Sequence, residues 1–190
     1  IVREAFENVA SYVGRLTMTI NMELNTDDVS LDISTSSVDN VEYDSVNNVY
    51  HTSGETVVTT MGMETTTATE NWIVNTDGTT ESYTLVPNTT SYIKEETNEN
   101  DLNRYYMSDA TFTIVEETDT EYVIEAVVKY GVISASVSDT VGDVEAGEDV
   151  DIPVTYVINK ETNTVSSIHI SISEDAGLGM NLDMLLEITP

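Results

Sequence analysis

Cysteine and histidine, two residue types that often carry enzymatic chemistry, are absent or scarce in this chain. There is no cysteine, so thiolate catalysis, disulfides and cysteine-zinc sites are excluded. The two histidines, His51 and His169, have no second ligand at a metal-binding spacing such as i, i+4. The sequence contains no G-x-S-x-G elbow, no G-x-G-x-x-G motif and no phosphate-binding loop. We therefore expect no catalytic residues, no enzymatic activity and no organic cofactor.

The densest group of carboxylates lies in the second half of the chain. It consists of Asp139, Asp143, Glu145, Glu148, Asp149 and Asp151. The spacing does not match the twelve-residue calcium loop, although carboxylate oxygens are the ligands that calcium prefers. Loose calcium binding and a solvated acidic surface are the two interpretations of this cluster.

Apolar side chains offer a different chemistry, the binding of a hydrophobic ligand. Methionine is flexible and polarisable, so it suits a surface that adapts to varied apolar molecules. Strand alternation places several methionines at inward positions, and an N-terminal helix with an apolar stripe would cover them. The predicted lining consists of Phe6, Val9, Val13, Met18, Met22, Met61, Met63, Trp72 and Met184. The alternative interpretation is ordinary core packing.

The charge balance excludes several classes of partner. The 190 residues include 35 Asp and Glu but only 6 Lys and Arg, which gives a net charge of −29. Binding to nucleic acid phosphates or to an anionic membrane surface requires clustered basic residues, so we expect neither. No run of 18 apolar residues occurs, so we expect no transmembrane segment.

The same charge and the first residue suggest a setting for the protein. A self-repelling acidic surface is screened by salt, so a salt-rich environment and a halophilic source are expected. The chain begins with Ile1 rather than Met, and removal of a signal peptide is the simplest cause. We expect a secreted or cell-surface protein, held at a membrane only through a segment upstream of Ile1.

Hydrophobic periodicity predicts a single domain, 1–190, of the α+β class made mostly of antiparallel strands. Apolar residues at spacings of three and four predict a helix over 1–15, ended by Gly14. Strict alternation from Leu16 opens a meander over 16–130, in which Ser53-Gly54 reads as a turn before a strand at 57–63. Spacings of four and three favour a second helix within 131–147, followed by an acidic loop, although the Ser, Thr and Val content disfavours that helix.

The pattern of apolar residues over 150–190 predicts a hairpin followed by a last strand. Residues 152–158 and 168–172 alternate on either side of a polar turn, and residues 180–188 alternate again. Runs of hairpins without regular βαβ units exclude a parallel doubly wound sheet. We expect a strongly bent sheet, or unclosed barrel, with helices on its concave face.

The order of these elements resembles that of the LolA/LppX-like extracytoplasmic lipoproteins. The fragments that prompt the comparison are Ser11-Tyr12 leading into 16–22, the hairpin at 72–78, and the turn with its flanking strands at 156–165. In that family a bent antiparallel sheet covered by helices holds lipid. The resemblance therefore implies a carrier for a lipid or another hydrophobic molecule.

Two functions from different classes follow from this sequence. The first is a non-enzymatic binding protein for a lipid or other hydrophobic ligand. The second is a structural or adhesive cell-surface subunit, in which edge strands pair between copies and acidic loops bind cations. The oligomeric state is not readable from the sequence.

Salt dependence of stability tests the interpretation of the charge. Because most carboxylates have no basic partner, their repulsion should weaken the fold at low ionic strength and fade as salt rises. We predict that the melting temperature climbs between about 0.05 M and about 1 M sodium chloride, measured by circular dichroism. A flat or falling curve would show that the charges are already compensated in the folded protein.

Overall fold

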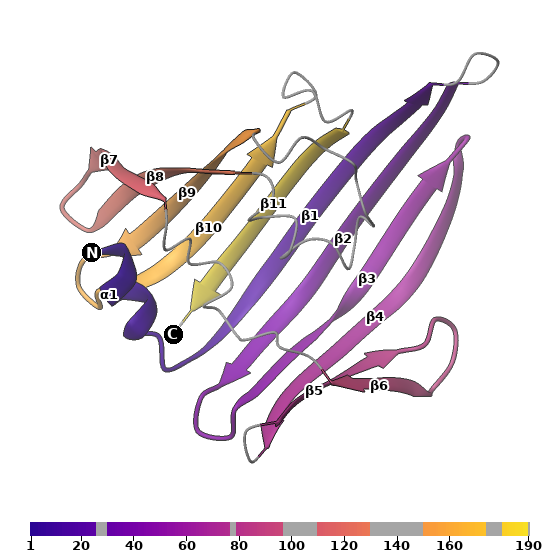
Figure 1. Cartoon of the computed structure of the whole chain (residues 1–190), viewed down its shortest axis with the longest axis horizontal. Helices are drawn as coiled ribbons and strands as arrows, with labels where there is room; N and C mark the ends of the chain where they lie inside the picture. Colours follow the sequence, from indigo (N-terminus) through magenta and orange to yellow (C-terminus); the bar gives the residue numbers. More distant parts are fainter. Residues whose placement is uncertain (26–29, 77–78, 97–109, 130–149, 174–179, 190) are drawn as a thin grey trace.

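The computed structural model describes residues 1–25, 30–76, 79–96, 110–129, 150–173 and 180–189. These residues form one short helix and a single sheet of eleven strands (Figure 1). The elements are α1 (Val2–Glu7), β1 (Ser11–Asn25), β2 (Ser30–Asp44), β3 (Val49–Thr60), β4 (Met63–Thr76), β5 (Thr79–Leu85), β6 (Tyr92–Glu96), β7 (Thr111–Glu117), β8 (Glu121–Lys129), β9 (Asp151–Asn159), β10 (Thr164–Ile172) and β11 (Met180–Thr189).

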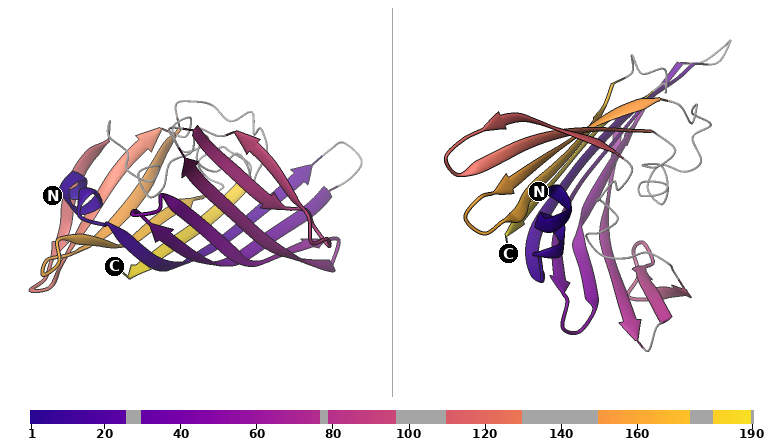
Figure 2. Two further views of the ribbon diagram at one scale, coloured as in Figure 1. Left: turned by 90° about the horizontal axis from the view of Figure 1, so that it is seen from below. Right: turned by 60° about the vertical axis from the view of Figure 1, so that its left-hand side comes forward.

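The sheet is antiparallel throughout, and its strand order is β6-β5-β4-β3-β2-β1-β11-β10-β9-β8-β7. Strands that are consecutive in sequence pair with each other except β6 and β7, which form the two edges, and β1 also pairs with β11. With eleven antiparallel strands, the two outer strands β6 and β7 run in the same direction and cannot close the sheet through an antiparallel ladder. Figure 2 shows that the sheet is twisted and curved but stays open. The predicted fold class, a mostly antiparallel unclosed sheet with an N-terminal helix, is confirmed.

The predicted alternation is confirmed along the two central strands. Met18 and Ile20 of β1 are buried, and Leu16 and Met22 pack against the core at its margin. Every described even position of β11 from 182 to 188 is buried, and the odd positions are more exposed. This pattern follows from the two-residue period of a strand whose faces meet different environments.

The core concentrates on β8 to β11. The largest side chains with essentially no exposed surface are almost all on β9, β10 and β11, with Tyr156 the biggest of them. Helix α1 packs on β9 and β10, and the Phe6 ring meets the Tyr156 ring edge-on at 5.8 Å between centroids. The Asn8 amide donates a hydrogen bond to the carbonyl of Asn163 at 3.0 Å, which fixes the end of the helix to the β9–β10 turn.

The N-terminal helix is much shorter than the sequence predicts. It ends at Glu7, and the chain is already extended from Ser11, so the prediction of a helix over 1–15 is wrong beyond its first half. Tyr12 is buried, but Val13 is 56% exposed, which is the alternation of a strand. Gly14 does not break a helix. It lies in β1 where a Cβ would come within 2.5 Å of the Glu187 carbonyl oxygen, so the close approach of β1 and β11 requires glycine there.

Two further expectations about the first hairpins are wrong. Ser53-Gly54 is not a turn but the middle of β3. The predicted strand over 57–63 is instead interrupted by a two-residue turn at Met61-Gly62, where both residues have positive φ. Met61 and Met63 consequently lie at the exposed tip of the β3–β4 hairpin, 73% and 69% exposed, and do not point inward.

The remaining strand predictions agree with the structure. The predicted hairpins form as β4–β5 and β9–β10, β7 and β8 form another hairpin, and β11 ends the described chain. The predicted second helix, within 131–147, lies outside the described residues. Whether the chain is one domain over its full length stays a prediction.

Replacement of Gly54 tests the tight packing of β2 against β3. A Cβ at this position would collide with the Val38 carbonyl oxygen and lie 2.6 Å from Oδ1 of Asp39, a largely buried carboxylate that accepts a hydrogen bond from Thr69 at 2.6 Å. A Gly→Ala change usually stabilises a chain by restricting its unfolded state. Gly54→Ala should instead lower the free energy of unfolding by about 1–3 kcal/mol, measured by urea denaturation.

The neighbouring residue provides the control for this prediction. Ser53 points to the opposite face of the sheet, so Ser53→Ala should change stability by less than about 0.5 kcal/mol. A stabilised Gly54→Ala variant would show that β2 and β3 are not as close as described.

Candidate binding groove

A row of side chains runs across six neighbouring strands on the face of the sheet opposite the core. Each member is the direct cross-strand partner of the next, from β1 to β6. The row, called the cross-strand row below, consists of Val13, Glu42, His51, Trp72, Tyr83 and Lys94. Directly opposed side chains on one face of an antiparallel pair touch, so this register brings together residues that are up to 81 positions apart (94 − 13).

Aromatic rings form the middle of the cross-strand row. The His51 imidazole stacks on the Trp72 indole with ring centroids 3.7 Å apart and an angle of 18° between their planes. At the far end the Lys94 ammonium lies over the Tyr83 ring, 5.6 Å from its centroid. Such contacts restrict the orientation of these flat, rigid side chains on the sheet.

Glu70 of β4 anchors these rings from beside the row. One carboxylate oxygen accepts hydrogen bonds from Nε1 of Trp72 at 3.1 Å and Nε2 of His51 at 3.2 Å, and the other accepts from the Tyr92 hydroxyl at 2.5 Å. The Tyr92 hydrogen bond, then that of Trp72, lowers the pKa of Glu70, against the opposing effect of desolvation. Because an ionised carboxylate only accepts hydrogen bonds, Nε2 of His51 carries a proton.

Glu42 faces the other ring nitrogen of the same histidine. Its Oε2 lies 3.7 Å from Nδ1 of His51, which is beyond hydrogen-bond distance. The His51 side chain is only 15% exposed, whereas that of Glu42 is 66% exposed. Glu42 therefore presents its carboxylate mainly to solvent.

The outer strands carry a second carboxylate with strong partners. Glu81 accepts from the Tyr83 hydroxyl at 2.7 Å and pairs with Nζ of Lys94 at 2.7 Å. The Lys94 hydrogen bond, then that of Tyr83, lowers the pKa of Glu81, and the same Glu81 contact raises the pKa of Lys94.

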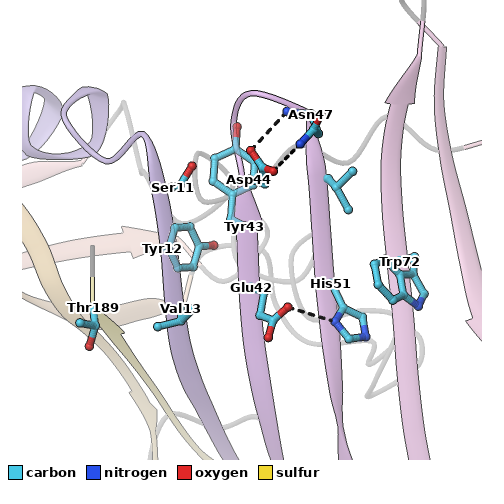
Figure 3. A pocket seen from close by; sticks show the side chains of 11 residues that line it. Ser11, Tyr12, Val13, Glu42, Tyr43, Asp44, Asn47, His51, Trp72 and Thr189 are labelled. Carbon is cyan, nitrogen blue, oxygen red and sulfur yellow. Dashed lines mark hydrogen bonds and ion pairs between the residues drawn. The ribbon is translucent and has the colours of Figure 1, made fainter.

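An open groove of about 760 Å³ lies at the β1–β2 end of this row (Figure 3). Its lining consists of Ser11, Tyr12, Val13, Glu42, Tyr43, Asp44, Asn47, Val49, His51, Trp72 and Thr189. Strand alternation places Tyr12 and Tyr43 on the core side, where their rings are 5.5 Å apart. Val13, Glu42, His51 and Trp72 belong to the cross-strand row, so the groove is bounded on one side by the stacked rings.

Asp44 marks the end of the groove at the β2–β3 turn. Its carboxylate accepts from the Val46 and Asn47 backbone amides at 2.9 and 3.3 Å and from the Asn47 side chain at 2.6 Å. The Asn47 side-chain bond is the main reason that the pKa of Asp44 is lowered. The groove therefore contains a carboxylate that stays ionised at neutral pH.

The structure separates the predicted lining residues into three groups. Val13 and Trp72 line the groove. Phe6, Val9, Met18 and Met184 are buried in the core, and Met22 packs at its margin, so these five follow the alternative interpretation of core packing. Met61 and Met63 are exposed at the hairpin tip, far along β3 and β4 from His51 and Trp72.

The acidic cluster is only partly described. Asp139, Asp143, Glu145, Glu148 and Asp149 lie outside the described residues, and Asp151 is exposed and pairs with Nζ of Lys129 at 2.8 Å. In the part of the chain that the structure describes, no group of three or more acidic or histidine side chains could hold a metal ion. Calcium binding at this cluster stays a prediction.

Sequence reasoning missed the residues that give the groove its polar character. His51 has no second ligand at a metal-binding spacing in the sequence, and Glu42, Asp44 and Glu70 are indistinguishable from the other carboxylates of so acidic a chain. What these four residues share is their position in the strands. Each occupies an alternating position whose side chain points to the face of the sheet opposite the core. His169 does face away from Ile168 and Ile170, as alternation predicts, and lies 3.0 Å from Oδ2 of Asp183.

Comparisons with known proteins give no family for this chain. No protein-family model and no curated protein matches it. Among solved structures, it is similar to a beta-barrel-like protein of a domain of unknown function from Brucella abortus, with 8% identity, coverage of 94% and 98% of the two chains and a TM-score of 0.40. It is also similar to a LolA superfamily protein from Nitrosomonas europaea, with 8% identity, coverage of 100% and 90% and a TM-score of 0.28. Likeness at this level does not assign the chain to either family.

Within the described residues, no helix has the length and apolar character needed to cross a bilayer.

The hydrogen bonds of Glu70 generate a prediction about acid stability. A carboxyl whose pKa is lowered by folding stabilises the native state above its unfolded pKa, and this contribution is lost as pH falls through the folded pKa. The difference in free energy of unfolding between wild type and Glu70→Gln should therefore shrink between about pH 5 and about pH 3, a range that brackets the ordinary glutamate pKa.

Tyr92→Phe provides the matched variant, because it removes the contact that lowers this pKa most. It should reduce the pH dependence attributable to Glu70 while leaving the carboxylate in place. A gap between wild type and Glu70→Gln that does not change with pH would contradict the assignment.

Proposed function

We propose that this protein is a non-enzymatic extracytoplasmic binding protein for a lipid or another ligand with a large apolar part, and that the groove is its binding site. The main support for this proposal is the presence and composition of the groove. Its volume falls within the range of about 300–1,000 Å³ that is usual for small-molecule sites. It combines exposed apolar surface with a rigid aromatic wall and a few polar groups.

Val13 supplies the most direct support. It is a β-branched apolar side chain, 56% exposed, on a strand whose buried positions already have their partners. Beside it stand the stacked rings of His51 and Trp72, held in place by Glu70. A ligand placed over Val13 would remove apolar surface from water without requiring the rings to reorient, which lowers the entropic cost of binding.

The extracytoplasmic setting is the second part of the proposal. The excess of carboxylates suits a salt-rich medium, in which their mutual repulsion is screened. A secreted or cell-surface location of a halophilic or salt-tolerant organism fits this charge.

The alternative is a structural or adhesive surface subunit that assembles through edge strands. One observation favours it: the outer strands β6 and β7 carry exposed apolar residues, among them Ile93, Ile114 and Val115. An edge strand with such residues is a template for pairing with another chain. Concentration-dependent self-association without any ligand binding would favour this alternative.

Val13→Glu tests the groove as a ligand site. Trp72 is the only tryptophan and lines the groove, so its fluorescence reports occupancy directly. Titration of wild type with a neutral amphiphile such as decyl maltoside, below its critical micelle concentration, should give a saturable change. Val13→Glu should weaken this binding about tenfold or more, because it places a charge where apolar surface must be buried.

Val38→Glu is the matched control. Val38 is also an exposed valine on the outward face, lies on the adjacent strand β2, and does not line the groove. It should bind the amphiphile as wild type does. Absence of any saturable signal in wild type, or equal loss in both variants, would reject the groove as the site.

A further inference from the structure

The charges that line the groove are all of one sign. Glu42 and Asp44 are its two carboxylates, and no lysine or arginine is among the described residues that line it. The two lie on the same face of β2, two residues apart. The groove is thus a local concentration of the negative charge that the chain carries as a whole.

The contacts of Glu42 leave it available to a ligand. The one basic group within 4 Å that the structure records for it is the imidazole of His51, at 3.7 Å from Nδ1, and two-thirds of the side chain is exposed. By contrast Glu81, on the same face, is engaged at 2.7 Å by Lys94. An amine close to Glu42 would gain a charge-assisted hydrogen bond for which no contact within the described residues is recorded.

The stacked rings favour the same sign of charge. The negative face of an aromatic ring attracts a cation within about 6 Å of its centroid, and tryptophan is the best of the ring types. The structure already shows this preference at the other end of the cross-strand row, where Lys94 lies over Tyr83. In the cross-strand row His51 lies between Glu42 and Trp72, so a cation beside Glu42 would meet the imidazole, with the Trp72 indole stacked behind it at 3.7 Å.

Apolar surface completes the site. Val13 and Val49 line the groove next to these carboxylates, so one ligand can place an apolar chain on the valines and a charged end at Glu42. The net charge of −29 attracts such a ligand over longer distances and repels an anionic one.

We propose that the groove selects amphiphilic cations, organic molecules with an apolar body and an ammonium end, with Glu42 as the main residue that recognises the charge. This inference rests on the proposed function and narrows its ligand class. It also separates the site from one for fatty acids or anionic phospholipids, which the carboxylates disfavour.

The test compares three ligands that share one chain and differ only in the head group. These are decyltrimethylammonium, decyl maltoside and decanoate, each titrated below its critical micelle concentration at low ionic strength. Trp72 fluorescence gives the dissociation constants, and far-UV circular dichroism verifies that the fold is retained. The cation should bind at least about tenfold more tightly than the anion, with the neutral ligand between them.

Glu42→Gln isolates the local effect from the net charge. It should reduce the preference for the cation over the neutral ligand about threefold to tenfold. Glu55→Gln changes the net charge by the same amount at an exposed position on the same face of the sheet, outside the groove, and should leave the preference unchanged. Glu42→Lys should invert the preference toward decanoate, which Glu55→Lys should not do.

The outcomes distinguish the inference from the function on which it rests. Equal affinity for all three ligands, or equal effects of the Glu42 and Glu55 variants, would overturn the selection of cations and leave the binding function standing. No binding of any of the three ligands would reject the binding function and this inference together. A loss of preference confined to the Glu42 variants would support both.

Discussion

The pairing of β1 with β11 is the constraint on which the rest of the molecule depends. It joins two meanders, β1 to β6 and β7 to β11, through one ladder that runs from Val13–Thr189 to Met22–Met180. The pairs Met18–Met184 and Ile20–Leu182 on its inner face are buried, so the seam between the two halves is part of the core. Because the partners are more than 150 residues apart, this ladder costs substantial chain entropy and needs that apolar seam to offset it.

The groove depends on the same ladder. Thr189 of β11 and Val13 of β1 are direct partners, and both line the groove, which continues over β2 to the rings on β3 and β4. If β11 leaves β1, the groove loses one wall and Val13 loses its neighbour. The terminal strand therefore couples folding of the whole sheet to formation of the site.

An acidic chain with so few basic residues must stabilise its carboxylates by other means. On the described strands and the β2–β3 turn neutral donors serve this purpose: Tyr92 and Trp72 hydrogen-bond to Glu70, Thr69 to Asp39, and Asn47 to Asp44. A hydrogen bond to an ionised acceptor is stronger than one between neutral groups. Aromatic and hydroxyl donors beside carboxylates consequently fix side chains that salt bridges would fix in a more balanced protein.

Local periodicity was enough to predict most strands but not the site. Alternation in residues 16–24 and 180–188 identified the central pair and its buried face, because that signal lies within each strand. The extent of α1 was mispredicted because Tyr12 fits both a helical stripe and a strand. Gly54 was mistaken for a turn because its actual role, room for the Val38 carbonyl, involves another strand. The cross-strand row required the registers of five strand pairs, and no single segment contains that information.

The position of the groove follows from how the sheet fails to close. A closed barrel encloses a ligand on its inner face, but an antiparallel ladder cannot join β6 and β7, which run the same way. The face that would line such an interior carries the core here, and Tyr156, Ile168 and Leu186 have no exposed surface. Val13 and Glu42, which line the groove, point the other way, so the proposed site lies on the face of the sheet opposite the core.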